Sequence, residues 1–230
     1  MPVLDVRNIS KSYFGTPVLA DVTFTVEQAE VVALTGQNGS GKSTLLRCLI
    51  GREEPDSGTV MFDGAEYHET LPAFRAAVAA GMEPGDEFAD LTVAEHLELM
   101  ARAHGNPDPG ELVQSVVAQL NLQKSADRFP FALSQGQRRR LGLASCLVRP
   151  RRLLVLDEPE SNLDIQGRAW LTDKIRSEKA AGVSVLFASH DPALVEQVAD
   201  SVVELFVDMV EDGSVEDGSV DDETPPAASA

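Results

Sequence analysis

The sequence predicts an α/β protein with a mostly parallel core sheet, an antiparallel β patch beside it and an inserted helical subdomain. The main observation is that short apolar runs alternate with helical patterns in the second half of the chain. The apolar runs span residues 153–156, 184–188 and 201–205, and the helical patterns span residues 138–148 and 167–180. This order is typical of parallel strands whose connecting helices cover the sheet.

The first third of the chain shows a different pattern, in which short strands follow one another through turns. These predicted strands of the antiparallel patch span residues 3–6, 18–26 and 59–62. A third pattern covers about residues 86–131, where no strong strand is found and where 93–104 and 110–120 look helical. We therefore expect a single domain over residues 1–210, with the helical subdomain at about 86–131 inserted in its α/β core.

Residues 211–230 have a composition that is unsuited to a folded core. The stretch from Asp208 to Glu223 holds eight acidic residues and no basic one, and no aromatic residue follows Phe206. Such a segment cannot bury enough apolar surface to fold by itself. We predict an acidic, disordered tail over residues 211–230.

The net charge of −18 is not confined to this tail, because the chain without those eight acidic residues still carries −10. An acidic balance argues against nucleic-acid binding, which depends on neutralising phosphates. The apolar runs are far shorter than the roughly 20 residues of a membrane-spanning helix, and no signal peptide opens the chain. We expect a cytoplasmic protein, with buried thiols at Cys48 and Cys146 rather than a disulfide.

Residues 36–43 read Gly-Gln-Asn-Gly-Ser-Gly-Lys-Ser and match the phosphate-binding pattern G-x-x-x-x-G-K-[ST]. A buried strand is expected before this loop and a helix after it, so that backbone N–H groups can bind a polyphosphate. We expect Lys42 to reach the β- and γ-phosphates, and Ser43 to ligate Mg²⁺. The expected nucleotide contacts are Gly36, Gln37, Asn38, Gly39, Ser40, Gly41, Lys42, Ser43 and Thr44.

A second part of the site is predicted at Asp157 and Glu158, which follow the apolar run 153–156. Ligands bind beyond the carboxyl ends of parallel strands. Asp157 is therefore expected to hold Mg²⁺, and Glu158 to orient or deprotonate an attacking water. Acidic residues after a strand can also be simple helix caps, but the phosphate loop in the same chain favours the catalytic interpretation.

Three further motifs lie in order around this apolar run. They are Leu133-Ser134-Gln135-Gly136-Gln137, Ser161-Asn162-Leu163-Asp164 and Ser189-His190-Asp191. With the phosphate loop and the acidic pair, they resemble the signature sequence, the D-loop and the switch histidine of ABC ATPases, the nucleotide-binding subunits of ATP-binding-cassette transporters. The resemblance covers about residues 3–205, and it implies a P-loop NTPase fold of the ABC type with ATP and Mg²⁺ as cofactors.

In that family two subunits dimerise head to tail, and each ATP lies between one phosphate loop and the partner's signature. The resemblance implies that Ser134, Gly136 and Gln137 contact the nucleotide of a second subunit, and that Asp164 belongs to the same site. A hydroxyl and N–H groups at a helix start suit an anion. Gln135 stands where the family more often has glycine, which a backbone contact tolerates. Ser134 can also be an ordinary N-cap, and the two roles are compatible.

The resemblance also assigns roles to three single residues. His190 is expected to bond the γ-phosphate and the attacking water. Tyr13 is expected to stack on adenine, with core packing and a role for Phe14 as the alternatives. Glu83 stands where the family usually has the Q-loop glutamine, and its carboxylate can still ligate Mg²⁺. The other histidines have no such context and are expected at the surface: His68, His96 and His104.

These features predict the ATP-hydrolysing subunit of an ABC transporter. As in the family, its membrane-spanning permease is expected to be a separate chain. The permease is expected to hold the subunit at the inner face of the cell membrane. A second ATPase subunit, identical or different, is expected beside it. The compact form resembles ATPases that serve exporters. A soluble ABC-type ATPase of DNA repair or translation is the alternative, but it fits poorly with the acidic charge and with the absence of a coiled-coil insertion or a second cassette. A non-hydrolysing regulatory subunit fits poorly with the presence of Lys42, Asp157, Glu158 and His190.

Overall fold

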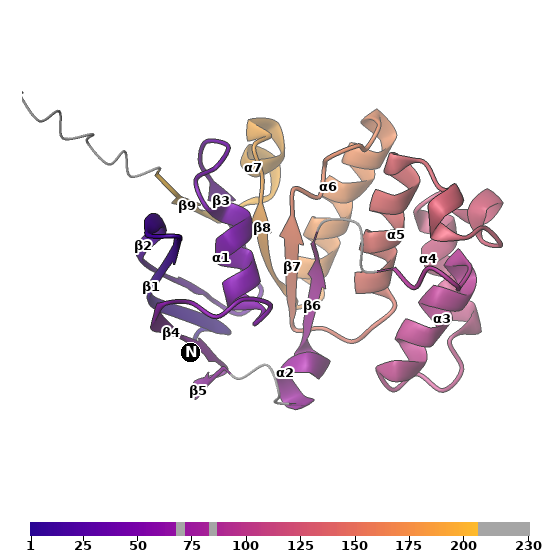
Figure 1. Cartoon of the computed structure of the whole chain (residues 1–230). Helices are drawn as coiled ribbons and strands as arrows, with labels where there is room; N and C mark the ends of the chain where they lie inside the picture. Colours follow the sequence, from indigo (N-terminus) through magenta and orange to yellow (C-terminus); the bar gives the residue numbers. More distant parts are fainter. Residues whose placement is uncertain (68–71, 83–86, 207–230) are drawn as a thin grey trace, which may run out of the picture.

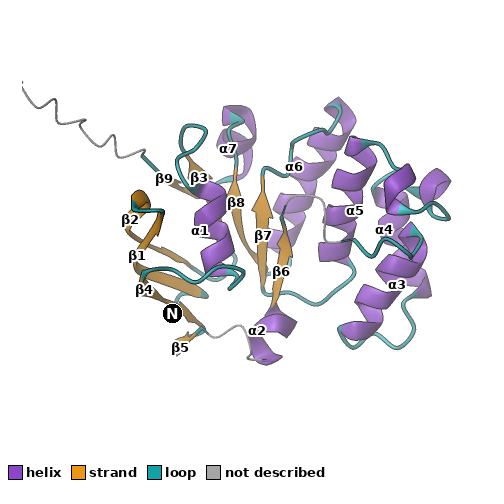
Figure 2. Cartoon of the chain, viewed as in Figure 1, coloured by secondary structure: helices purple, strands orange, loops and turns teal. Residues whose placement is uncertain are grey.

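Two sheets and the helices around them form the protein, as seen in a computed structural model that describes residues 1–67, 72–82 and 87–206. Figure 1 shows the antiparallel sheet on one side, the parallel sheet in the middle and the helical stretch 93–147 on the other side. Figure 2 shows that loops cluster at the two ends of the parallel strands. The predicted metal ligand Glu83, the residue His68 and the predicted tail over 211–230 all lie outside the described residues.

The parallel sheet has its strands in the order β6-β7-β8-β3-β9. Their bounds are β3 (Val31–Thr35), β6 (Val78–Gly81), β7 (Leu153–Asp157), β8 (Ser184–Ala188) and β9 (Ser201–Glu204). The central strands β3, β7 and β8 are buried on both faces, which explains why they appear in the sequence as continuous apolar runs. The sequence did not reveal β6, because Val78-Ala79-Ala80-Gly81 is short and rich in small residues with little strand preference.

The antiparallel sheet has the strand order β2-β1-β4-β5. Its strands are β1 (Leu4–Tyr13), β2 (Thr16–Val26), β4 (Ser57–Phe62) and β5 (Ala65–Glu66). β1 continues to Tyr13 instead of ending near residue 6, because three shifts of register let it keep pairing with β2 through a polar stretch. This extension brings the end of β1 to Tyr13.

Helices cover both faces of the parallel sheet. They are α1 (Lys42–Leu49), α2 (Pro72–Ala77), α3 (Val93–Ala103), α4 (Gly110–Gln119), α5 (Gln135–Leu147), α6 (Ile165–Ala180) and α7 (Pro192–Val198). In Figure 1, α1 lies between the two sheets, while α5 and α6 lie on the other side of the parallel strands. No helix within the described ranges is long and apolar enough to cross a membrane. Helices rather than strands occupy the described residues between 87 and 131, where a helical stretch was expected.

The parallel sheet separates two hydrophobic cores, because alternate residues of a strand point to opposite faces. One core joins Val32, Leu34 and Val155 to α1 and to the antiparallel sheet. The other joins Leu156 and Phe187 to helices α3 to α7. The phosphate-loop helix α1 and the signature helix α5 are therefore anchored on opposite faces of one sheet.

The expectation that His96 lies at the surface is wrong. Its side chain is buried, with Nε2 2.9 Å from Ser145 Oγ and Nδ1 accepting a hydrogen bond from the Phe88 N–H at 3.4 Å. Burial lowers the pKa of His96, so the ring packs as a neutral group that joins α3 to α5. His104 is partly buried as well. The expectation for the cysteines is confirmed, because Cys48 and Cys146 are free, buried thiols.

Glu178 on α6 holds the segment that leads into β7. Its carboxylate accepts two hydrogen bonds of 2.7 Å from Arg151, and Lys174 Nζ lies 2.7 Å away. Burial by itself would raise the pKa of Glu178, but the hydrogen bonds from Arg151 and Lys174 outweigh burial and lower it. The carboxylate therefore stabilises the fold above the pKa that it has in the unfolded chain.

We expect Glu178→Gln to lower the free energy of unfolding by roughly 3–5 kcal/mol at neutral pH, because two cations lose a buried partner. The loss should shrink as the pH falls below about 4, where the wild-type carboxylate is itself protonated in the unfolded chain and then in the folded one. Urea denaturation of both proteins between pH 3 and 7 measures this. A difference that stays constant over that range would contradict the role of the charge.

Candidate nucleotide-binding site

Three neighbouring strands end at one edge of the parallel sheet, and each carries a predicted site segment. The phosphate loop follows β3, Asp157 ends β7 and Glu158 comes directly after it, and His190 follows β8. Backbone hydrogen bonds tie these ends together: the Glu158 N–H donates to Ala188 O at 2.9 Å, and the Ser189 N–H donates to Leu34 O at 3.1 Å. The strand order β7-β8-β3 thus assembles one site from residues more than a hundred positions apart.

The phosphate loop has a shape that only glycine permits at two positions. At Gly36 a Cβ atom would lie 2.3 Å from Leu205 O, and at Gly41 it would lie 2.7 Å from Leu19 Cδ2. Gly41 also has a φ of 88°, which L side chains rarely adopt. The Lys42 ammonium is buried inside the loop and donates to Gly36 O and Gln37 O, each at 2.9 Å. The loop therefore curls around a fixed positive charge.

The start of α1 is suited to a polyphosphate. Its N-cap is Gly41, and within the described part of the chain no side-chain hydrogen bond caps this helix start. By contrast, α5 and α6 are capped by Ser134 and Asp164. Unpaired N–H groups at a helix start bind anions. The loop residues Gln37, Asn38 and Gly39 are exposed, whereas Ser40, Lys42 and Thr44 form its buried wall and Ser43 is partly exposed.

The acidic pair and the histidine meet next to this loop. Asp157 is buried, whereas the side chains of Glu158 and His190 are 38% and 55% exposed. His190 Nδ1 lies 3.4 Å from Glu158 Oε1, and Ser161 Oγ donates to Glu158 Oε2 at 3.2 Å. Glu158 has a φ of 43°, so the chain turns sharply after β7 and directs the two carboxylates differently. Glu158 and His190 can therefore act on one solvent-accessible group.

The signature segment forms the start of α5. Ser134 is its N-cap in a reciprocal capping box, because Ser134 Oγ accepts from the Gln137 N–H at 3.3 Å and Gln137 Oε1 accepts from the Ser134 N–H at 3.0 Å. The helix thus begins at Gln135, three residues before the helical pattern that the sequence shows from residue 138. A Cβ atom at Gly136 would lie 2.8 Å from Asn162 O. The signature and the D-loop are therefore in close contact within one chain.

Asp164 lies in the same contact region and caps α6 by accepting from the Gly167 N–H at 2.9 Å. Arg140 on α5 donates to the same carboxylate at 2.7 Å. Hydrogen bonds from the Gly167 backbone and from Arg140 lower the pKa of Asp164. The structure therefore gives Asp164 two contacts within this chain.

Tyr13 stands at the end of β1 and is partly buried. Its hydroxyl donates to Glu53, which also accepts from Arg47 on α1 at 3.2 Å, and Lys11 Nζ lies 5.8 Å from the ring centre. Phe14 is fully exposed at a φ of 52°. The structure therefore links Tyr13 to α1 through Glu53 and leaves the Phe14 side chain fully exposed, which favours Tyr13 as the ordered aromatic of this loop.

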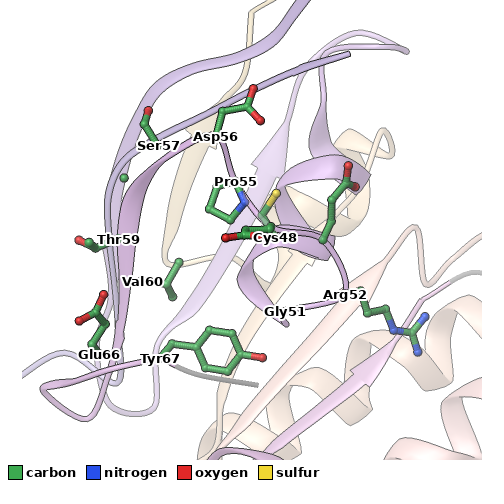
Figure 3. Close-up of a pocket in the computed structure, with 13 residues that line it drawn as sticks. Cys48, Gly51, Arg52, Pro55, Asp56, Ser57, Thr59, Val60, Glu66 and Tyr67 are labelled. Atoms are coloured by element: carbon green, nitrogen blue, oxygen red, sulfur yellow. The ribbon is translucent and has the colours of Figure 1, made fainter. Parts of the chain in front are cut away.

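A hollow of about 580 Å³ opens at the far end of α1, away from the phosphate loop (Figure 3). Cys48, Asp56, Glu66 and Tyr67 line it, and no residue of the phosphate loop does. Burial raises the pKa of the Cys48 thiol to about 11, so this group stays protonated at neutral pH. The acidic lining does not suit a triphosphate, and we assign the nucleotide to the other end of α1.

Two buried charged residues at the site were not found from the sequence. Arg139 on α5 donates to Met82 O at 3.1 Å and to Asp157 O, and Glu160 accepts from Ser189 Oγ at 2.5 Å. Arg139 is the middle one of three consecutive arginines, and Glu160 follows a proline in a loop. Both patterns are typical of solvent-exposed charge, so no local signal distinguished them.

These features define a P-loop nucleoside triphosphatase, in which a phosphate loop, an acidic pair and a histidine share one sheet edge. The chain belongs to the ABC transporter family, because the model of that family matches residues 19–161. As a member it is an ATP-binding ATPase, which confirms the family resemblance, the fold class and the expected enzyme class.

Individual relatives agree with this assignment. The chain is 31% identical to the SkfA peptide export ATP-binding protein SkfE of Bacillus subtilis, over 94% of this chain and 88% of that protein. It is 30% identical to the spermidine/putrescine import ATP-binding protein PotA of Haemophilus influenzae, over 93% of this chain and 58% of that protein. A solved structure of an ATP-binding subunit of an ABC transporter superposes with a TM-score of 0.79 at 30% identity, covering 89% of this chain and 88% of the other.

Proposed function

We propose that the chain binds and hydrolyses ATP to power an ABC transporter whose membrane-spanning permease is a separate chain. The observation that carries this proposal is the pairing of Glu158 with His190, 3.4 Å apart, at the sheet edge where the phosphate loop begins. The purified protein should release phosphate from ATP only with Mg²⁺, and a membrane protein that co-purifies with it should change the rate. Absence of phosphate release with and without that membrane protein would contradict the proposal.

The positions of the site residues support the following proposed roles. The phosphate loop, residues 36–44, binds the phosphates and Tyr13 stacks on adenine. Lys42 neutralises the β- and γ-phosphates, Glu158 orients and deprotonates the water, and His190 bonds the γ-phosphate. The oxygen donors Ser43 and Asp157, with Glu83 as a third, suit Mg²⁺, which would neutralise phosphate charge when bound. The uncapped start of α1 and the buried Lys42 ammonium support the fit of this loop to the phosphates.

A second ATPase subunit is part of the proposal. The signature residues Ser134, Gly136 and Gln137 start α5, which is anchored in a different core from α1. Figure 1 shows the two helices separated by parallel strands. Because the signature residues and the phosphate loop belong to helices anchored in different cores, we assign Ser134 and Gly136, with Gln137 and Asp164, to the nucleotide of the partner subunit, identical or different.

The permease is proposed to dock at a basic hollow of about 640 Å³ between the sheets and the helical stretch. Arg75, His104 and Arg149 are among its lining residues. Arg149 donates to Val78 O at 2.8 Å, and burial lowers its pKa. Basic groups in a chain of net charge −18 support an acidic docking segment on the permease. Through this contact the subunit would lie at the inner face of the membrane.

Charge reversal at this hollow should break the complex. We expect Arg75→Glu, at an exposed position, to reduce co-purification of the permease several-fold at low salt, because like charges repel across the interface. Arg176→Glu on α6, outside the hollow, serves as the control. Equal recovery of the permease with both variants would show that this hollow is not the docking surface.

We propose export as the direction of transport, on the support of SkfE, which is named for peptide export and matches over 88% of its own length. The alternative of a soluble ABC-type ATPase in DNA repair or translation is less supported, because the acidic charge opposes contact with nucleic acid. Stable isolation with a membrane protein favours the transporter. Isolation with DNA or ribosomes instead would favour the alternative.

A further inference from the structure

Glu160 is a buried carboxylate next to the proposed catalytic pair. It is only 2% exposed, although it lies two residues after Glu158 in the loop that leaves β7. Its Oε1 atom accepts a hydrogen bond of 2.5 Å from the hydroxyl of Ser189, which is 1% exposed. The same hydroxyl accepts a hydrogen bond of 3.0 Å from the Asp191 N–H. Glu160 thus holds, through one hydroxyl, the residues on both sides of His190.

Burying this carboxylate is costly unless a cation lies near it. Arg139 of α5 is buried in the same interior at 4% exposed, where burial lowers its pKa while Asp157, Glu160 and Glu158 favour its charged form. Its guanidinium also donates to the carbonyls of Met82 and Asp157, so it is fixed to the ends of β6 and β7. Glu160 therefore lies in a buried interior that also contains a guanidinium group.

The side chains of Glu158 and His190 have fewer constraints than the buried Glu160. The side chains of Glu158 and His190 are both more than a third exposed, and their closest nitrogen–oxygen contact is 3.4 Å, which is long for a hydrogen bond. Their relative position must come from the backbone segments that carry them. The hydrogen bond between Glu160 and Ser189 joins those two segments.

We propose that Glu160 and Ser189 are positioning residues, which hold His190 against Glu158 in the geometry needed for ATP hydrolysis. This inference rests on the proposed function of that pair. Loss of the hydrogen bond would let the 189–191 turn shift relative to the loop after β7. A displacement of about 1 Å in a catalytic group can cost up to about a hundredfold in rate. ATP binding, which depends on the phosphate loop, would be little affected.

The test compares Ser189→Ala with Ser189→Thr and Ser184→Ala. We expect Ser189→Ala to lower kcat at least roughly tenfold with the KM for ATP changed less than about twofold. Ser189→Thr keeps the hydroxyl and should restore kcat. Ser184 lies at the other end of β8, is fully buried and donates to Glu27 O at 2.8 Å. Ser184→Ala therefore removes a comparable buried hydrogen bond and should keep the wild-type kcat even where its melting temperature falls.

A double-mutant cycle with His190→Ala separates positioning from a general loss of structure. In single-turnover assays with excess enzyme, Ser189→Ala should cause no further loss in the His190→Ala background, because it acts through His190. Additive losses, or a wild-type kcat in Ser189→Ala, would overturn the inference while leaving the proposed function intact. Wild-type turnover in His190→Ala would instead contradict the proposed function and, with it, this inference.

Discussion

Glu158→Gln is expected to leave ATP binding intact and to slow hydrolysis roughly 10²-fold or more, which is the usual effect of losing a general base. Glutamine retains an oxygen at this position but cannot accept a proton from water at neutral pH. The side chain is partly exposed, and its contacts are with His190 and Ser161 rather than with the core. The substitution should therefore change chemistry without changing the fold. Steady-state phosphate release and nucleotide binding, measured on the same preparations, test both parts.

The same variant should accumulate an ATP-bound dimer, because the sandwiched nucleotide is no longer hydrolysed. Size-exclusion chromatography with ATP and Mg²⁺ should show the dimer for Glu158→Gln and mainly monomer for the wild type. Asp173→Asn, at an exposed carboxylate of α6, is the matched control and should behave like the wild type. Wild-type turnover in Glu158→Gln would contradict the role of Glu158 as a base. A monomer with wild-type binding of ATP would contradict the shared site.

Lys42→Ala is expected to abolish measurable ATP hydrolysis and to weaken ATP binding. The ammonium is buried inside the phosphate loop, where its charge is poorly screened by water, so its interaction with a phosphate is strong. Removal also deletes two hydrogen bonds to loop carbonyls, those of Gly36 and Gln37. Titration with a fluorescent ATP analogue and a phosphate-release assay measure the two effects.

Two controls make the Lys42 result interpretable. The melting temperature without nucleotide shows whether the loop still folds, and Lys124→Ala, at an exposed lysine distant in sequence, shows the effect of losing one positive charge. Lys42→Ala should lose both binding and hydrolysis, whereas Glu158→Gln should lose hydrolysis alone. Near-normal turnover in Lys42→Ala would exclude residues 36–43 as the phosphate site.

Much of the fold could be predicted from the sequence because its signals are local. β8 spans the predicted residues 184–188, and α6 ends at the predicted residue 180. These elements have long apolar or periodic patterns, which depend on neighbours in the chain alone. β6 escaped prediction because it is only four residues long and three of them are Ala or Gly, so it forms a strand only between a neighbouring strand and the helices that cover it.

Burial of single charged or polar residues could not be predicted in the same way. His96 was expected at the surface, yet it packs against Phe88 and Ser145 from other segments. Arg139 and Glu160 look like surface charges in the sequence, but both are buried because α5 and the loop after β7 are brought together. Which member of a charged run is buried depends on partners that lie far away in the chain.

The sequence by itself determined the chemistry of the site: an octapeptide whose glycines permit a phosphate-binding loop, a strand that ends in two carboxylates, and a histidine after the next strand. These are properties of short segments, because backbone dihedral angles and helix starts are set by a few adjacent residues. Only the tertiary structure decided that β7, β8 and β3 are neighbours, so that Glu158, His190 and the phosphate loop meet at one edge. It also decided that α1 and α5 lie in separate cores. Strand order and the pairing of distant charges depend on how whole elements pack, and no short segment contains that information.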